Sequence, residues 1–177
     1  SFDFQWCCQT RIDEVDEQIL ELMSKAGCRL IHYGIESYRH LAEGGKYKNH
    51  NLDTLKKIIQ LTRRLGIKTL CFYIIGFKNY LTREDKETLQ LLHSVDSSYV
   101  SLHRYHNILD VNLLKDYITE QRRKSQDKID RAIFFHLLRY YLHPLRIRDL
   151  LIQEKKRAIF RDVHFFLKTI AKTWFRN

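Results

Sequence analysis

Residues 66–76 read Gly-Ile-Lys-Thr-Leu-Cys-Phe-Tyr-Ile-Ile-Gly, a nearly continuous apolar run between two glycines. A half-exposed strand alternates apolar and polar residues, whereas a strand of a parallel sheet covered by helices is apolar on both faces. A glycine just past the last turn of a helix favours the left-handed conformation that ends it. The stretch therefore predicts a buried parallel strand over residues 67–76, with Gly66 closing the helix before it.

The same unit of helix, glycine and strand lies upstream. Gly27 precedes a second apolar strand at residues 28–37. The helix that Gly27 closes is predicted to begin at the N-cap Asp13. Its apolar face is formed by Val15, Ile19, Leu22 and Met23.

Two more helices and two more strands complete the pattern. The helix before Gly66 is predicted to begin at Asn51, and Thr82 and Asp85 form a capping box at the start of another. Strands are predicted at residues 3–11 and 98–106. This rhythm is typical of parallel βαβ units, although by itself it does not distinguish a barrel from an open, doubly wound sheet.

In both architectures the functional groups lie at the C-terminal ends of the strands. The candidate positions are Gln9–Arg11, Glu36–Ser37, Gly76–Asn79 and His103–Asn107.

Glu36 is the most informative of these positions. It stands in Gly34-Ile35-Glu36-Ser37, where a small and an apolar residue are followed by two polar ones. A carboxylate at a strand end can accept hydrogen bonds from a ribose diol or bind an ammonium group. The alternative is that Glu36 caps the following segment or pairs with Lys46 or Lys48.

Gln9 and Gly76 are weaker candidates. Gln9 and Arg11 could hold a polar ligand, although Arg11 could equally pair with Asp13 or Glu14. Gly76 would let the backbone approach a ligand closely, and its alternative is a simple strand-ending turn.

The run His103-Arg104-Tyr105-His106-Asn107 resembles a metal site only at first sight. Alternation along a strand puts His103 and Tyr105 on one face and Arg104 and His106 on the other, so the two histidines do not converge. A cofactor- or substrate-facing role for one of them is favoured over a metal site.

Composition sets the broad class. The chain has 177 residues, of which 44% are hydrophobic and 29% charged, which is typical of a globular protein. No apolar run approaches the roughly 18 residues needed to cross a bilayer. The spacing of the cysteines suits neither a disulfide framework nor a zinc site and indicates reduced thiols in a cytoplasmic protein. They are Cys7, Cys8, Cys28 and Cys71.

Several short segments, taken in order over residues 2–105, share a family pattern. They are Trp6-Cys7-Cys8-Gln9-Thr10-Arg11, Ala26-Gly27-Cys28, Gly34-Ile35-Glu36-Ser37, Gly66-Ile67-Lys68-Thr69 and Tyr73-Ile74-Ile75-Gly76. This set resembles the second half of the radical S-adenosylmethionine enzymes, and most closely the branch with an N-terminal cobalamin-binding domain. Arg139-Tyr140-Tyr141-Leu142-His143-Pro144 is similar to a segment in the C-terminal helices of that branch.

The resemblance implies an α/β fold, namely the second half of a partial, TIM-like (β/α) barrel followed by C-terminal α-helices. In the family, a four-iron, four-sulfur cluster cleaves S-adenosylmethionine to a 5′-deoxyadenosyl radical, and one branch also uses cobalamin and transfers methyl groups. It implies that Gln9, Glu36, Ser37 and Gly76 bind S-adenosylmethionine: Glu36 contacts the ribose, Gln9 lines the same site and Gly76 packs against the adenine.

The chain also departs from the family. Phe77-Lys78-Asn79-Tyr80-Leu81-Thr82 lacks the Pro, second Gly and Glu that usually follow Gly76. The cysteine loop that holds the cluster is absent, and the first residue is not Met. We therefore expect a fragment that is inactive without the N-terminal half of its barrel, with catalytic residues and metal ligands outside these 177 residues.

The formal net charge of +10 is concentrated in the last third of the chain. We expect residues 1–110 to form the barrel part and residues 111–177 a basic helical extension. That extension closes the open side of the barrel or lies on an anionic membrane surface, and nucleic-acid binding is the weaker interpretation because the charges are dispersed. An alternative to the enzyme is a non-catalytic barrel remnant that binds a partner or a membrane through this extension.

Overall fold

The computed structural model describes residues 4–39, 52–78, 80–105 and 120–153, without the side chains of 120–124 and 149–153. The chain divides into two compact units, Ser1–Ile129 and Asp130–Asn177. Each unit is described by itself. The predicted helix cap Asn51, the predicted domain boundary near residue 110 and the candidates Asn79, His106 and Asn107 lie outside the described residues.

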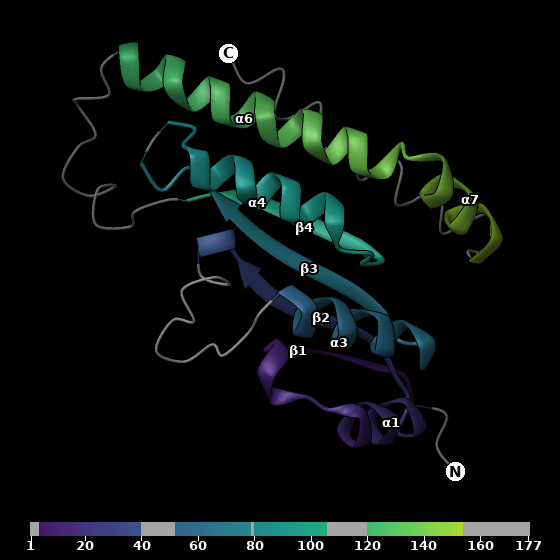
Figure 1. Cartoon of the computed structure of the whole chain (residues 1–177). Helices are drawn as coiled ribbons and strands as arrows, with labels where there is room; N and C mark the ends of the chain where they lie inside the picture. The colour runs from purple at the N-terminus through teal and green to yellow at the C-terminus, as the bar shows by residue number, and fades with distance from the viewer. Residues whose placement is uncertain (1–3, 40–51, 79, 106–119, 154–177) are drawn as a thin grey trace. The chain divides into compact units, whose positions relative to one another are not determined.

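The first unit contains a parallel sheet of four strands in the order β1-β2-β3-β4 (Figure 1). The strands are β1 Trp6–Thr10, β2 Cys28–Glu36, β3 Lys68–Ile75 and β4 Tyr99–Arg104. The α/β prediction is confirmed.

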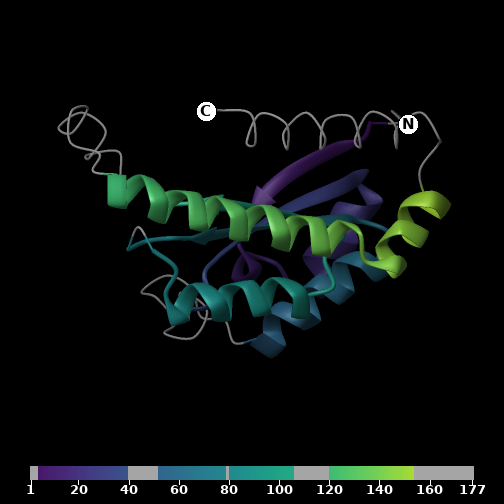
Figure 2. The ribbon, with the colours of Figure 1, turned by 90° about the horizontal axis from the view of Figure 1, so that it is seen from above.

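The strand order also bears on the choice between barrel and open sheet. A doubly wound sheet reverses its order at a switch point, whereas these four strands follow one another without reversal. Because parallel crossovers are almost always right-handed, such an order puts all connecting helices on one face, as in a barrel. Figure 2 shows α1, α3 and α4 on the same side of the sheet. They are α1 Glu17–Lys25, α3 Leu52–Arg64 and α4 Arg83–Ser94.

The start of α1 corrects the sequence prediction. Asp16 is the N-cap, and its carboxylate accepts a hydrogen bond of 2.8 Å from the amide of Ile19. Asp13 instead lies in a short 3-10 turn, Ile12–Glu14, and its carboxylate binds the Arg11 guanidinium. Two aspartates stand close together before this helix, and the ion pair with Arg11 decides which of them is free to cap it.

The predicted apolar face of α1 is wrong. Because the helix begins after Asp16, Val15 lies outside it, and its buried residue is Leu20, whereas Ile19 and Leu22 are exposed.

The predictions for two glycines and for one capping box are confirmed. Gly27 and Gly66 have φ angles of 91° and 77° and follow α1 and α3 as left-handed helix terminators. Thr82 and Asp85 form the expected capping box of α4.

The core lies between the sheet and these helices. Burial alternates along β3, where Thr69, Cys71, Tyr73 and Ile75 are buried and the intervening residues are only partly buried. On β2 the buried Tyr33 forms a hydrogen bond of 2.9 Å with Thr62 of α3. The two faces of the central strands are therefore unequal, although the continuous apolar sequence of β3 suggested two covered faces.

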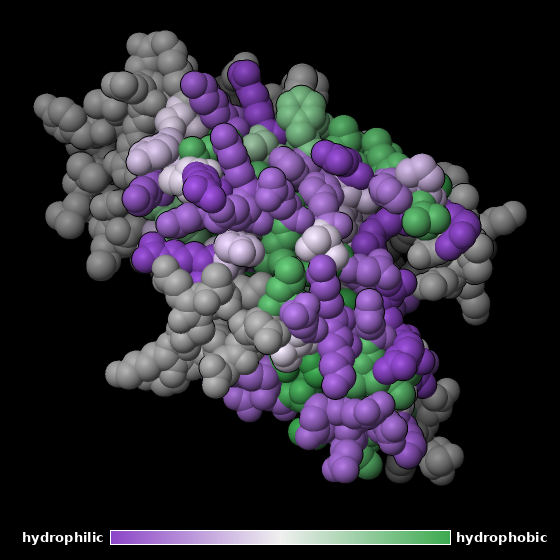
Figure 3. Space-filling view, in the orientation of Figure 1, coloured by the Kyte–Doolittle hydropathy of each residue, from purple (hydrophilic) through white to green (hydrophobic). Residues whose placement is uncertain are grey.

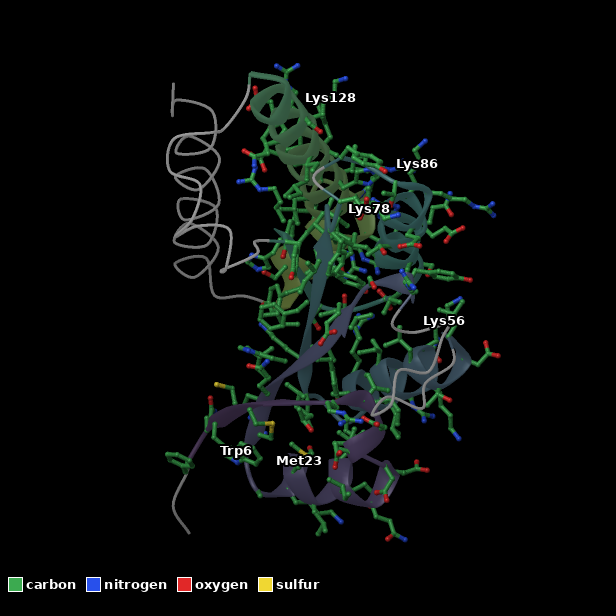
Figure 4. The ribbon with its side chains drawn as sticks, turned by 90° about the vertical axis from the view of Figure 1, so that its left-hand side faces the viewer. Trp6, Met23, Lys56, Lys78, Lys86 and Lys128 are labelled. Atoms are coloured by element: carbon green, nitrogen blue, oxygen red, sulfur yellow. The ribbon has the colours of Figure 1, made fainter. Side chains whose placement is uncertain are left out.

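The solvent side of the unit is polar. Figure 3 shows mainly hydrophilic residues over the outer side of α3 and α4. Lys56 on α3 and Lys86 on α4 point away from the sheet (Figure 4). Trp6 and Met23 lie at the end of the unit opposite to Lys78, which follows β3.

The helix α6, Glu120–Tyr141, runs from the first unit into the second, where α7, Pro144–Gln153, follows it. Within the second unit the Arg146 guanidinium lies 4.1 Å from the centre of the Tyr140 ring. No helix in the described parts of the chain is both long and apolar enough to span a bilayer.

Candidate functional site

The predicted site positions lie along one edge of the sheet because all four strands are parallel. The register pairs Gln9 of β1 with His32 of β2, and Glu36 at the end of β2 with Tyr73 of β3. Gly76 directly follows the end of β3. The strand ends thus form a row along which one elongated ligand could contact several strands.

Glu36 has the most unusual backbone of this row. Its φ angle is 68°, and it is the only non-glycine residue with a positive φ in the described part of the chain. The β2–β3 register shifts between Gly34 and Glu36, which marks a bulge. A left-handed conformation costs a non-glycine residue on the order of 1–2 kcal/mol, and such residues gather at binding sites. The sequence contained no signal for this strain.

The backbone strain can be measured by comparing two substitutions that both remove the carboxylate. Glu36→Gly relieves the positive φ, whereas Glu36→Ala retains it, so the glycine variant is expected to be more stable by about 1 kcal/mol. Urea unfolding of both variants measures the difference. Equal stabilities, or a more stable alanine variant, would show that residue 36 is not strained.

Arg11 is engaged locally. Its Nε donates a hydrogen bond of 2.9 Å to Asp13, and its Nη1 lies 4.0 Å from Glu14. The hydrogen bond to Asp13 raises the pKa of the guanidinium, and the charges of Asp13, Glu14 and Glu36 act in the same direction against partial desolvation. The structure thus contains the pairing with Asp13 and Glu14 that was the alternative for Arg11. The Glu36 carboxylate is near enough to contribute to the raised pKa of Arg11.

Gly76 forms a fixed corner. Its φ angle is 81°, and its amide donates a hydrogen bond of 2.8 Å to the buried carboxylate of Asp85. A Cβ at this position would lie 3.0 Å from Cδ1 of Ile129. The amide is thus used within the protein, so Gly76 would contribute to a ligand site through the shape of the corner. The strand-ending turn offered as its alternative is present.

Ser37 and Gln9 differ in accessibility. Ser37 is buried directly after the strained Glu36, whereas Gln9 is exposed near the end of β1. Gln9 is therefore the more accessible of the two to a ligand at this edge.

A row of rings on the partly buried face of the sheet was missed by sequence reasoning. The ring of Phe72 on β3 lies 5.7 Å from that of His32 on β2 and 6.2 Å from that of His103 on β4. The Ser101 hydroxyl oxygen and Nε2 of His103 are 2.6 Å apart, within hydrogen-bonding distance. His103 had been singled out, but nothing distinguished Phe72 within an apolar run whose two faces look alike.

The cysteines do not form a cluster site. Cys7 is exposed, Cys8 is partly buried, and Cys28 and Cys71 are buried. Among the described residues no group of three or more His, Cys, Asp or Glu side chains could hold a metal ion. These residues therefore do not fit a four-iron cluster.

Cys8 is expected to ionise late. Burial, followed by the neighbouring Cys28 and Cys7, raises the pKa of the Cys8 thiol to about 11. A thiol with a raised pKa stabilises the fold while protonated, so this contribution is present below the ordinary thiol pKa and is lost as the pH rises towards 11. Because Cys7 is exposed, we expect it to react before Cys8 with a thiol reagent at pH 8. We also expect Cys8→Ser to reduce the loss of stability at alkaline pH, measured by urea unfolding at a series of pH values. An unaltered pH profile of stability in Cys8→Ser would contradict this prediction.

Comparison with known proteins supports the resemblance seen in the sequence. No family model matches the chain. Over 101 residues it is 27% identical to an uncharacterised methyltransferase of Pyrococcus horikoshii, a match that covers 55% of this chain and 21% of that protein. The structure of coproporphyrinogen III oxidase (HemN) from Escherichia coli, a radical SAM enzyme, superposes with a TM-score of 0.54 at 13% identity over 74% of this chain. The chain has the fold of part of a radical S-adenosylmethionine enzyme.

The match is partial in every case. The chain spans about a fifth of the length of its curated relative and 31% of HemN. The methyltransferase TsrM from Kitasatospora setae, solved with cobalamin and an iron–sulfur cluster, gives a TM-score of 0.47 at 18% identity over 57% of this chain and 20% of its own. The superposition on HemN confirms the predicted fold class, a part of a radical SAM barrel.

Proposed function

We propose that this chain contributes the nucleoside-binding edge of a radical S-adenosylmethionine enzyme. The observation that carries the proposal is the left-handed Glu36 on a bulge at the end of β2. Strain of this kind persists where the surrounding structure holds it, and it places a carboxylate at the edge where parallel α/β sheets bind ligands. A carboxylate there suits the two hydroxyl groups of a ribose.

Each proposed site residue has a separate task. Glu36 accepts the ribose hydroxyls, and the Gln9 amide hydrogen-bonds polar groups at the adjoining strand end. Ser37 fixes the backbone after Glu36. Gly76 is buried beneath the Ile129 side chain, so it shapes the adenine site by fixing the turn after β3 and not through a surface of its own. Arg11 lies close enough for the Glu36 charge to contribute to its raised pKa, so the site holds a positive charge near this carboxylate.

The reaction belongs to the whole enzyme. We propose that residues other than those described would hold a four-iron, four-sulfur cluster, which would supply the electron for cleaving S-adenosylmethionine, for radical formation or methyl transfer. The dependence on cobalamin is proposed from the sequence resemblance alone. The contribution of this chain is to bind and orient the nucleoside.

The proposal can be tested by equilibrium dialysis of S-adenosylhomocysteine against the chain. We expect weak binding that Glu36→Gln reduces about ten-fold, since a charge-assisted hydrogen bond is roughly twice as strong as a neutral one. Adenosine should compete better than 2′,3′-dideoxyadenosine, which lacks both hydroxyls. Equal competition by the two nucleosides, or no effect of Glu36→Gln, would contradict the role of Glu36.

A second candidate function rests on the second unit. In the described part of this unit, four large apolar side chains are exposed among the arginines Arg139, Arg146 and Arg148. They are Phe135, Leu142, Leu145 and Ile147. Exposed apolar groups beside cations are typical of segments that lie on anionic membranes.

Co-sedimentation with vesicles tests this second function. Binding to phosphatidylserine-containing vesicles but not to pure phosphatidylcholine, weakened by Leu145→Glu, is the expected result. Equal sedimentation with and without phosphatidylserine would contradict it.

A further inference from the structure

The strand ends of β2 and β3 are both tied to the first two turns of α4. The Tyr38 amide donates a hydrogen bond of 3.0 Å to Oγ1 of Thr88, and the Gly76 amide donates one of 2.8 Å to Oδ1 of Asp85. Arg39 also lies 3.7 Å from the carboxylate of Glu84. The connection is unexpected because α4 belongs to the crossover between β3 and β4, not to the segment that follows β2.

The tie to Thr88 explains where the chain goes after Glu36. A left-handed residue after a bulge turns the backbone out of the strand direction. Two residues later the Tyr38 amide meets the Thr88 hydroxyl, which itself donates a hydrogen bond of 2.9 Å to the Glu84 carbonyl. Thr88 and Ser37 are buried and the hydrogen bond is partly buried, so loss of the Thr88 hydroxyl would leave the Tyr38 amide without its partner on that side.

We propose that Thr88 and Asp85 are positioning residues that hold Glu36 and Gly76 at a fixed spacing, with Thr88 keeping Glu36 in its left-handed conformation. The helix α4 is the shared support, because Thr88 and Asp85 lie three residues apart and hence on the same face. We call the hydrogen bonds of Thr88 to Tyr38 and of Asp85 to Gly76 the clamp. Its role in ligand binding rests on the proposed function, whereas its effect on the backbone does not.

Thr88→Val tests the clamp because valine has the same shape without the hydroxyl. The matched control is Thr62→Val on α3, because Thr62 is also buried. Like Thr88, it donates a hydrogen bond to the carbonyl four residues earlier, at 2.7 Å, and its hydroxyl also contacts a second group, the Tyr33 hydroxyl. Thr88→Ser keeps the hydroxyl and should behave as the unmodified chain. Amide hydrogen exchange and the affinity for S-adenosylhomocysteine are measured for each variant.

We expect Thr88→Val to speed exchange of the Tyr38 amide roughly ten-fold relative to the most protected amides, and Thr88→Ser to restore it. Thr62→Val should leave the Tyr38 amide unaffected even if it destabilises the fold. Unchanged exchange in Thr88→Val, or the same increase in Thr62→Val, would overturn the clamp.

The ligand measurements test the function separately. If the exchange results support the clamp but the chain does not bind S-adenosylhomocysteine, the proposed function is refuted and the clamp is not. Where the ligand binds, a weaker affinity in Thr88→Val restored by Thr88→Ser supports the positioning role, and an unchanged affinity overturns it.

Discussion

Replacing Gly27 with alanine is expected to lower the free energy of unfolding by about 3 kcal/mol, through a strained backbone and an overlap that side-chain motion cannot relieve. Gly27 has a φ angle of 91°, and a Cβ there would lie 2.1 Å from the carbonyl oxygen of Phe4. The amide of Trp6 donates a hydrogen bond of 3.2 Å to the Gly27 carbonyl, so a shift of this corner would also disturb the start of β1.

Gly66 provides the matched control. It ends α3 with a φ angle of 77°, but a Cβ there would meet no atom within 4 Å. Gly66→Ala should therefore cost only the backbone term, about 1 kcal/mol. Urea unfolding of both variants measures the difference. Similar losses for the two would contradict the close approach of Phe4 to Gly27.

Replacing Asp85 with alanine is expected to lower the free energy of unfolding by about 3 kcal/mol, because it combines the loss of a helix cap with an unsatisfied buried amide. The carboxylate accepts hydrogen bonds from the Gly76 amide at 2.8 Å, the Thr82 amide at 2.7 Å and the Thr82 hydroxyl at 2.8 Å. Asp85 is 3% exposed, so water does not readily replace these contacts.

The adjacent Glu84 provides the control for Asp85. Glu84 also stands in the first turn of α4, but its ion pair with Arg39 is about half exposed, and such pairs contribute about 0–1 kcal/mol. Glu84→Ala should therefore change stability little in thermal or urea unfolding. An Asp85→Ala variant as stable as Glu84→Ala would show that the β3–α4 corner does not depend on the carboxylate.

The sequence predicted those elements whose signals are local. Gly27 and Gly66 need a left-handed backbone, and the Thr82–Asp85 box satisfies amides within its own turn, so each could be recognised from a few neighbouring residues. The choice of Asp16 over Asp13 as a cap depended on an ion pair with Arg11, which a propensity argument does not weigh. Parallel strand ends could be expected at one edge, since that follows from topology alone.

Other features depend on contacts between distant segments. Glu36 was selected for its carboxylate, but its bulge and positive φ arise from the β2–β3 register. The hydrogen bond between Tyr38 and Thr88 joins residues fifty positions apart. The position of Phe72 could not be predicted because the sequence of β3 is apolar at positions on both faces of the strand. Only the alternation of burial in the structure distinguishes the two faces.

The central claim is that the strand ends around Glu36 form a nucleoside-binding edge. The most direct measurement is a map of amide chemical shifts during titration of the chain with S-adenosylhomocysteine. The account predicts saturable shifts concentrated at Gln9, at Glu36–Tyr38 and next to Gly76, all of which Glu36→Ala reduces. Shifts concentrated at the opposite end of the sheet near Trp6, or none at millimolar ligand, would contradict it.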